Sequence, residues 1–191
     1  MKTLSFLPLF FICLSFFFSS CQKEVRFPTT NTDTTGGGGI PGGSAYYIKA
    51  KKDGVQKTYT SLASANIIDF SSTGVLSLAL FAGVPNNLEG LNLVINFFNG
   101  TTIKTGTYLE EYSGFDYLIG GVYNPNSTSI VYGAGLQSPS LKPLVITILT
   151  KTINEMTGKF EGAFYKQGPN GLISPAEYIL FTEGEFKLPI K

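Results

Sequence analysis

From Ala45 onward, polar and apolar side chains alternate with a period of two residues, and turn-forming residues recur between the alternating segments. Leu91, Leu93 and Ile95, for example, alternate with Asn92. A period of two places successive side chains on opposite faces of a β-strand, whereas a helix needs a period near 3.6. The pattern therefore predicts an all-β domain of about ten short antiparallel strands.

We expect these strands to form a single antiparallel β-sandwich, with a closed β-barrel as the alternative. Asp53-Gly54 lies between two alternating segments and predicts a tight hairpin turn, and a longer hairpin loop is expected between Lys166 and Pro175. The segment Ser61 to Phe70 does not decide between a short helix and a strand. Further strands are expected at residues 75–81, 91–97, 105–109, 115–123, 128–133 and 144–152.

Charged side chains indicate which face of the last strands meets water. Phe160 and Phe164 alternate with charged residues, and Tyr165 falls on the charged, solvent-facing side of that segment. Glu183 and Glu185 likewise alternate with apolar residues, so we expect both on the wet face of the final strand.

The first twenty residues have the layout of a secretory signal peptide. Met1-Lys2 is a short basic start, an apolar run extends from Leu4 to Phe18, and the small residues Ser19-Ser20 precede Cys21. The apolar run would span roughly 22 Å as a helix, which is shorter than a hydrocarbon core of about 30 Å. We therefore expect residues 1–20 to be removed rather than to remain as a membrane helix.

The end of this leader resembles the lipobox of bacterial lipoproteins, through Phe18-Ser19-Ser20-Cys21. The resemblance implies that Cys21 carries a diacylglyceryl group and becomes the first residue of the mature chain. Cys13 is a poor rival because Ile12 stands where a small residue is needed. The implied location is the outer membrane, with the chain held by its lipid, most simply at the cell surface and alternatively at the periplasmic face.

Residues 21–44 form a lipid-anchored linker rich in Gly and Thr, and residues 45–191 form the all-β domain. Gln22-Lys23-Glu24 is similar to the export signals of surface lipoproteins of Bacteroidota. Asp33-Thr34-Thr35 is similar to the O-glycosylation motif of the same phylum, which implies a glycan on Thr34. Gly36 to Gly39 is not followed by the Lys and Ser or Thr of a phosphate-binding loop, so it is interpreted as linker.

The domain itself resembles a group of uncharacterised Bacteroidota lipoproteins with a β-sandwich-like domain. The resemblance lies in strand motifs, and the closing motif of that group usually has Asn or Gly at the position of Glu183. The motifs are Ala50-Lys51-Lys52-Asp53-Gly54-Val55, Thr105-Gly106-Thr107-Tyr108, Thr157-Gly158-Lys159-Phe160-Glu161-Gly162-Ala163-Phe164 and Thr182-Glu183-Gly184-Glu185-Phe186. Their glycines and aromatic residues imply a fold and no catalytic residue.

Composition restricts the chemistry further. The chain has no His, which excludes the usual zinc ligand, the usual general base near neutral pH and the Ser-His-Asp arrangement. Loss of Lys2 with the leader leaves 13 basic and 13 acidic side chains, and a neutral chain is not suited to non-specific nucleic-acid binding. We expect neither a cofactor nor a metal ion.

Two groups of carboxylates are candidate sites. Glu183 and Glu185 stand two apart on one strand face, at about 7 Å, a separation compatible with a glycosidase pair, but a solvated sheet face is the simpler interpretation. Glu110, Glu111 and Asp116 surround a turn and offer oxygen ligands for Ca²⁺, but their spacing matches no known calcium loop, and a surface turn is favoured.

Four tyrosines are candidates for a binding surface, because the Tyr side chain offers a flat ring with a polar hydroxyl at its tip. Tyr112, Tyr117, Tyr123 and Tyr132 are candidates for an exposed platform that binds sugar or peptide, although packing in the core is the preferred interpretation.

The sequence thus predicts a non-catalytic, lipid-anchored envelope or surface lipoprotein that binds or scaffolds an unknown protein or glycan partner. The first alternative is a carrier with a small apolar ligand inside a β-barrel. A carboxylate-dependent enzyme is the third interpretation.

Overall fold

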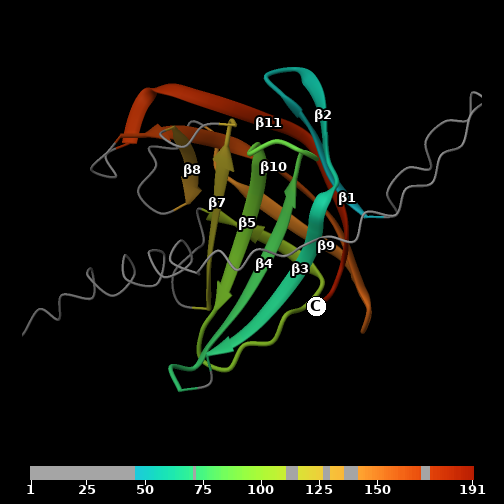
Figure 1. The fold of residues 1–191 in the computed structure, drawn as a ribbon. Coiled ribbons are helices and arrows are strands. Elements are labelled where there is room, and N and C mark those ends of the chain that lie inside the picture. The colour runs from blue at the N-terminus through green and yellow to red at the C-terminus, as the bar shows by residue number, and fades with distance from the viewer. Residues whose placement is uncertain (1–45, 71, 111–115, 127–129, 136–141, 169–172) are drawn as a thin grey trace, which may run out of the picture. The chain divides into compact units, whose positions relative to one another are not determined.

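A computed structural model describes residues 46–70, 72–110, 116–126, 130–135, 142–168 and 173–191, all of which belong to one compact unit, Pro41–Lys191. Its elements are all β-strands (Figure 1). The strands are β1 (Tyr47–Lys52), β2 (Val55–Tyr59), β3 (Ser61–Phe70), β4 (Val75–Gly83), β5 (Gly90–Phe97), β6 (Gly106–Leu109), β7 (Tyr117–Asn124), β8 (Val131–Gly135), β9 (Val145–Lys151), β10 (Glu155–Gln167) and β11 (Ile173–Pro189).

All eleven strands belong to one sheet, in the order β2-β1-β11-β10-β8-β7-β5-β4-β3, with β6 and β9 branching from β10. The sheet branches because β10 is long: residues 156–161 pair with β9, and residues 165–167 pair with β8. Every paired strand runs antiparallel to its neighbour. The all-β prediction is confirmed.

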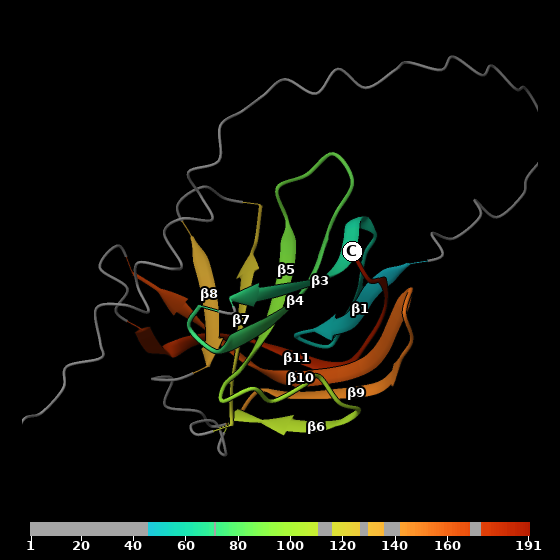
Figure 2. The ribbon, with the colours of Figure 1, turned by 90° about the horizontal axis from the view of Figure 1, so that it is seen from below.

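The sheet curls until its two ends nearly meet, as the view from below shows (Figure 2). Ala65 of β3 forms a parallel bridge with Ile190, and the N–H of Lys191 donates to the carbonyl oxygen of Ala65 at 3.0 Å. Only Thr60 separates β2 from β3, so the chain also turns a corner between the two ends. The architecture is therefore barrel-like, closer to the closed barrel than to two separate sheets.

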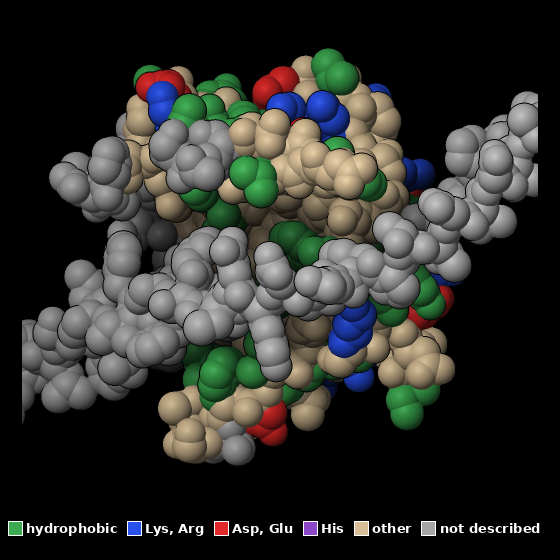
Figure 3. Space-filling view, in the orientation of Figure 1, with side chains coloured by type: hydrophobic (Ala, Val, Ile, Leu, Met, Phe, Trp, Pro, Cys, Tyr) green, Lys and Arg blue, Asp and Glu red, His purple; other side chains and the backbone are tan. Residues whose placement is uncertain are grey.

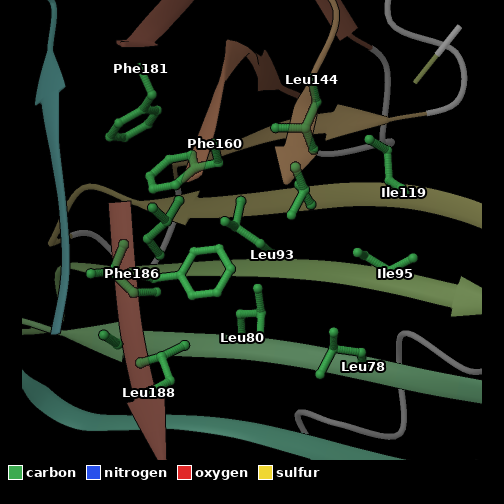
Figure 4. Packing of buried hydrophobic residues seen from close by; sticks show 14 of the residues in the cluster. Leu78, Leu80, Leu93, Ile95, Ile119, Leu144, Phe160, Phe181, Phe186 and Leu188 are labelled. Carbon is green, nitrogen blue, oxygen red and sulfur yellow. The ribbon is translucent and has the colours of Figure 1, made fainter. Parts of the chain in front are cut away.

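Hydrophobic side chains fill the inside of this barrel. Leu80 and Leu93 from β4 and β5 point towards Phe181 and Phe186 of β11 (Figure 4), and all four are at most 2% exposed. The ring of Phe181 lies at the centre of an aromatic group, with centroids 5.3 Å from Tyr123 and 5.1 Å from Phe164. Such edge-on aromatic contacts add stability beyond the burial of area.

The glycines of the two late sequence motifs make room for these rings. Gly158 of β10 is paired in register with Phe186 of β11, and Phe160 of β10 with Gly184 of β11. A Cβ atom built on Gly158 would meet the ring of Phe186, and one built on Gly184 would meet Phe160. The sequence motifs at residues 157–164 and 182–186 therefore pair with each other across β10 and β11, and each aromatic ring lies over a glycine of the other strand.

Several local predictions are confirmed. Leu91, Leu93 and Ile95 are fully buried, as the alternation predicts. The structure also decides a segment that the sequence leaves open, because Ser61–Phe70 is a strand. The hairpin between β10 and β11 is present, with Gln167 paired to Ile173; the middle of its loop lies outside the described residues.

One assignment to the wet face is wrong. Tyr165 is only 1% exposed, because its ring packs against Tyr178 at a centroid distance of 5.8 Å and its register partner on β8 is Gly133, which has no side chain to displace it.

Candidate functional site

One end of the barrel gathers elements from across the sequence. Because neighbouring strands are antiparallel, the end of β4, the start of β5, the end of β7 and the start of β8 all lie at the same end. The turn between β1 and β2 also lies there, at the top of Figure 1. This end is termed the upper end.

The β1–β2 hairpin is held at the upper end by its turn. Asp53 and Gly54 have φ angles of 49° and 82°, the left-handed pair that a two-residue hairpin turn requires. The backbone N–H of Asp53 donates to the carbonyl oxygen of Leu180, and the N–H of Leu180 donates to Asp53 Oδ1, both at 2.9 Å. These two bonds fix the hairpin to β11 and so position the side chain of Lys52.

Glu89, in the connection between β4 and β5, is the centre of a polar cluster. The hydroxyls of Tyr123 and Tyr59 donate to Glu89 Oε1 at 2.8 Å and 3.4 Å. Lys52 Nζ donates to the hydroxyl oxygen of Tyr123 at 3.0 Å, and Lys57 Nζ lies 4.0 Å from Glu89 Oε2. Lys52, Lys57, Tyr59, Glu89 and Tyr123 are termed the Glu89 cluster; they join β1, β2, β7 and the β4–β5 connection.

Burial sets the electrostatics of this cluster. Tyr59 and Tyr123 are fully buried, and the side chain of Glu89 is 12% exposed. Burial raises the pKa of the Tyr59 hydroxyl, and the charge of Glu89 raises it further. Burial also raises the pKa of the Tyr123 hydroxyl, with the hydrogen bond to Glu89 as the second cause. Both hydroxyls therefore remain protonated near neutral pH and act as hydrogen-bond donors to the carboxylate.

The raised pKa values make the two tyrosines hydrogen-bond donors rather than general bases. A general base must be deprotonated near the working pH, and the raised pKa values keep both tyrosine hydroxyls protonated there. Glu89 is occupied by its two donors. The ammonium of Lys57, whose side chain is 38% exposed, is the charged group of the cluster best placed to meet a partner from outside.

Exposed apolar side chains lie on the segments that meet at the upper end. The structure describes eight large hydrophobic side chains as exposed, and five of them lie on segments at this end: Val55, Leu62, Leu88, Ile130 and Tyr178. Leu62 is 73% exposed and has a φ of 54°, a strained conformation for leucine. The backbone N–H of Leu88 donates to Asn126 Oδ1 at 3.1 Å, which ties the β4–β5 connection to the segment after β7. Figure 3 shows hydrophobic and charged side chains together along this edge.

A hollow lies where the pairing of β10 with β11 becomes irregular. The register shifts between Phe160 and Gly162 on β10, and Glu183 on β11 has a φ of 51°. Two adjoining cavities of about 370 and 260 Å³ open there and share Val145 and Glu161 in their walls. Bulges often occur beside functional sites, but here the lining combines basic, acidic and apolar groups without a distinct chemical character.

Glu183 and Glu185 are each paired with a lysine. Glu183 makes an ion pair with Lys51 at 2.6 Å, and Glu185 makes one with Lys49 at 2.6 Å while also accepting a hydrogen bond from Tyr47 at 2.9 Å. The hydrogen bond from Lys49 lowers the pKa of Glu185. Both carboxylates lie on the outer face, as predicted, among lysines that occupy them.

The proposed calcium ligands are only partly placed. Glu110 Oε2 accepts the backbone N–H of Leu144 at 2.7 Å, so it is engaged in holding the segment before β9. Glu111 lies outside the described residues. Within the described ranges, no three acidic, Cys or His side chains are grouped so as to hold a metal ion.

The tyrosines do not form an exposed platform. Tyr123 is fully buried, Tyr117 packs edge-on against Tyr108 at 5.1 Å, and Tyr132 lies against Tyr123 at 6.2 Å. The interpretation as core packing holds for these three. Tyr112, Cys21 and Thr34 lie outside the described residues.

No pattern in the sequence predicts the Glu89 cluster. Glu89 follows Pro85-Asn86-Asn87-Leu88 in a turn-like segment, where an acidic residue is ordinarily solvated. Lys52 and Tyr59 lie in the first hairpin, whose alternation carries no sign of a contact with Glu89. A carboxylate just before a buried strand is the available signal, but its hydrogen-bond partners Tyr59 and Tyr123 lie 30 and 34 residues away in the sequence, and no local pattern reveals them.

In the part of the chain that the structure describes, no helix is sufficiently long and apolar to span a membrane.

Comparison with known proteins adds no identity. No family model matches the chain, and no curated protein or solved structure matches it significantly.

Proposed function

We propose that this chain is a non-catalytic lipoprotein, anchored to the outer membrane through Cys21, whose domain binds or scaffolds a partner at its upper end. The observation that carries the binding role is the group of exposed apolar side chains around the Glu89 cluster. Monomeric proteins expose single hydrophobic residues everywhere, but several such residues gathered beside buried charges are typical of an interaction surface.

The proposal of a lipid anchor is supported by the apolar leader and by Phe18-Ser19-Ser20-Cys21. Two or three fatty chains on one cysteine hold a protein at a membrane without any basic patch, which suits a mature chain with balanced charges. The export-signal resemblance of Gln22-Lys23-Glu24 favours the cell surface over the periplasmic face, and a glycan at Thr34 belongs to the same proposal.

The filled interior weighs against the alternative of an apolar-ligand carrier. Phe160, Phe164 and Phe181 occupy the space between the two sides of the barrel, with ring centroids 5.1 to 6.2 Å apart. A small-molecule carrier needs a hollow of at least about 300 Å³ lined mainly by apolar groups. The cavity of about 370 Å³ at the β10–β11 irregularity has Lys142 and Glu161 in its wall. An enzyme finds less support still, since the carboxylates at Glu89, Glu183 and Glu185 are each held by donors or lysines.

The anchor is tested with radioactive palmitate. Wild-type chain should incorporate label and partition with membranes, and Cys21→Ser should do neither. A Cys21→Ser chain that still partitions with membranes would contradict the lipid anchor. Protease treatment of intact cells then reports which face of the membrane the domain occupies.

The binding surface is tested by photo-crosslinking in living cells, with the photoreactive residue placed at Leu88 of the upper end. The matched control is Ile153, which is 88% exposed in the β9–β10 turn at the opposite end. We expect a discrete adduct from position 88 and none from position 153. Adducts of equal yield from both positions, or none from position 88, would contradict the proposed surface.

A further inference from the structure

The β2 strand has one edge that no described strand covers. β2 lies at the end of the sheet order and pairs only with β1, and the β1–β2 hairpin rises above β3 at the upper end (Figure 1). The chain passes from β2 into β3 through Thr60, but β3 pairs with β4, on the other side. Beyond Thr60 the two sides separate, because β4 ends at Gly83 and the chain then turns at Pro85. The edge of β2 that faces away from β1 is termed the free edge.

Two residues of β2 direct their backbone groups at the free edge. In an antiparallel pair, alternate residues bond to one neighbour and the residues between them point to the other side. The β1–β2 turn has two residues, so the residues that flank it bond to each other and the even-numbered positions of β2 point away from β1. Thr60 agrees with this direction, because its N–H donates to the carbonyl oxygen of Gly83 on the β4 side at 2.9 Å. The N–H and C=O groups of Gln56 and Thr58 therefore face the free edge.

β2 lacks most of the features that protect a sheet edge. Natural edges are protected by proline, by bulges or by charged side chains. β2 has no proline, its pairing with β1 has no register shift, and Gln56 and Thr58 are both exposed. Its one charged residue is Lys57, whose ammonium lies beside Glu89. The free edge is therefore open to a further strand.

We infer that the partner of the upper end is a polypeptide, and that an extended segment of it pairs with the free edge as an added strand. This inference rests on the proposed binding role of the upper end. An extended peptide presents N–H and C=O groups at the spacing of a strand, which is the complement of Gln56 and Thr58. Val55 and Leu62, which are 62% and 73% exposed, lie at the two ends of the free edge and offer apolar contacts to the side chains of the segment.

Lys57 sets the charge of that segment. Its side chain is 38% exposed, and its Nζ atom is 4.0 Å from Glu89 Oε2. Residues directly opposite each other on paired strands share a face, where opposite charges stabilise the pair and like charges destabilise it. The added strand should therefore carry Asp or Glu opposite Lys57. A second copy of β2 is less suitable, because the two-fold register that pairs each Gln56 with a Thr58 places Lys57 opposite Lys57.

The first test uses a synthetic peptide of alternating Val and Thr with a central Glu, and the full chain isolated from its cells in detergent. Binding is measured by fluorescence anisotropy up to about 1 mM peptide. A comparison peptide has the same side chains, with N-methyl groups in place of the amide hydrogens. We expect the plain peptide to bind about tenfold more tightly, the equivalent of one backbone hydrogen bond, and also more tightly than a peptide with a central Lys. Equal binding of the plain and N-methylated peptides, or no binding of the plain peptide, overturns the inference.

The second test places proline on the free edge. Thr58→Pro removes an N–H that the fold does not use, and its ring obstructs an added strand, so peptide binding should weaken about tenfold. Gln56→Pro replaces it if circular dichroism shows that Thr58→Pro does not fold. The matched control is Asp69→Pro, at the far end of β3. There the N–H of Lys191 donates to the carbonyl oxygen of Ala65, so Asp69, four residues further along, also points away from β4. The control should bind as wild type does, and unchanged binding in a folded free-edge variant overturns the inference.

A third test separates this inference from the proposed binding surface. The photoreactive residue at Leu88 is combined with Thr58→Pro in living cells. We expect the yield of the Leu88 adduct to fall about tenfold, and mass spectrometry of the wild-type adduct to show a peptide segment that contains Asp or Glu. An undiminished adduct, or an adduct to a glycan, overturns strand addition and leaves the upper-end surface in place. Absence of any adduct from Leu88 in wild type overturns both.

Discussion

Tyr123 of β7 donates its hydroxyl hydrogen to Glu89 of the β4–β5 connection across 2.8 Å, inside the upper end of the barrel. The same hydroxyl oxygen accepts a hydrogen bond from Lys52 of β1 at 3.0 Å. One phenol thus links three segments that are distant in sequence, and it orders the end of the barrel at which the exposed apolar residues gather.

Tyr123→Phe should lower the free energy of unfolding by about 2 kcal/mol, because it removes a hydrogen bond to a largely buried carboxylate. The measurement is urea unfolding followed by circular dichroism. Tyr178→Phe is the control, since Tyr178 is 47% exposed and the loss of its hydroxyl should change stability by less than about 0.5 kcal/mol. Equal stability of Tyr123→Phe and wild type would show that the Glu89 cluster does not order the upper end.

Alkaline titration should distinguish Tyr59 and Tyr123 from exposed tyrosines. Both have a raised pKa in the folded chain, first through burial. Below the pKa of an unfolded tyrosine, about 10, both states hold the proton and stability is unaffected. Above it, the unfolded state releases protons that the folded state retains, so stability falls as pH rises. Absorbance at 295 nm should show exposed tyrosines ionising first and a later group ionising together with loss of the near-ultraviolet circular dichroism. A single early transition, complete before the fold is lost, would contradict the buried assignment.

Glu183→Gly should stabilise the domain by about 1 kcal/mol. Glu183 has a φ of 51°, a left-handed conformation that costs an ordinary side chain about 1 to 2 kcal/mol and costs glycine almost nothing. The lost ion pair with Lys51 is exposed and contributes little. Glu185→Gly, two residues along the same strand, lacks this conformation and should destabilise instead. The melting temperature should therefore rise in Glu183→Gly and fall in Glu185→Gly, relative to wild type. A lower melting temperature for Glu183→Gly would show that the ion pair with Lys51 outweighs the backbone strain.

Gly184→Ala should destabilise the domain by about 2 to 3 kcal/mol, because the added methyl group would overlap the backbone oxygen and ring of Phe160. Phe160→Leu introduced into the same chain should recover part of the loss, since it removes the ring from that position. Chemical unfolding of the single and double variants measures the coupling. If the losses in the free energy of unfolding are additive, Gly184 is not needed to accommodate the ring of Phe160.

Much of this architecture was predictable from local patterns. The alternation of Leu91, Leu93 and Ile95 with asparagines fixed the buried face of β5, because a strand whose inner face is packed cannot shift by one residue. Asp53-Gly54 predicted a two-residue hairpin because both positions adopt left-handed backbone at low cost. Ser61–Phe70 stayed undecided, since its apolar residues fit either period, and pairing with β4 decided it.

The sequence by itself determined that the domain is all-β and, on regularly alternating strands such as β5, which side chains face the core, because both follow from the two-residue geometry of a strand. Only the tertiary structure decided that the sheet curls into a near-barrel, that Tyr165 is covered, and that Glu89 meets Tyr59 and Tyr123. These features depend on which strands become neighbours. Strand order is chosen by the summed packing of the whole sheet, and no segment of a few residues carries that information.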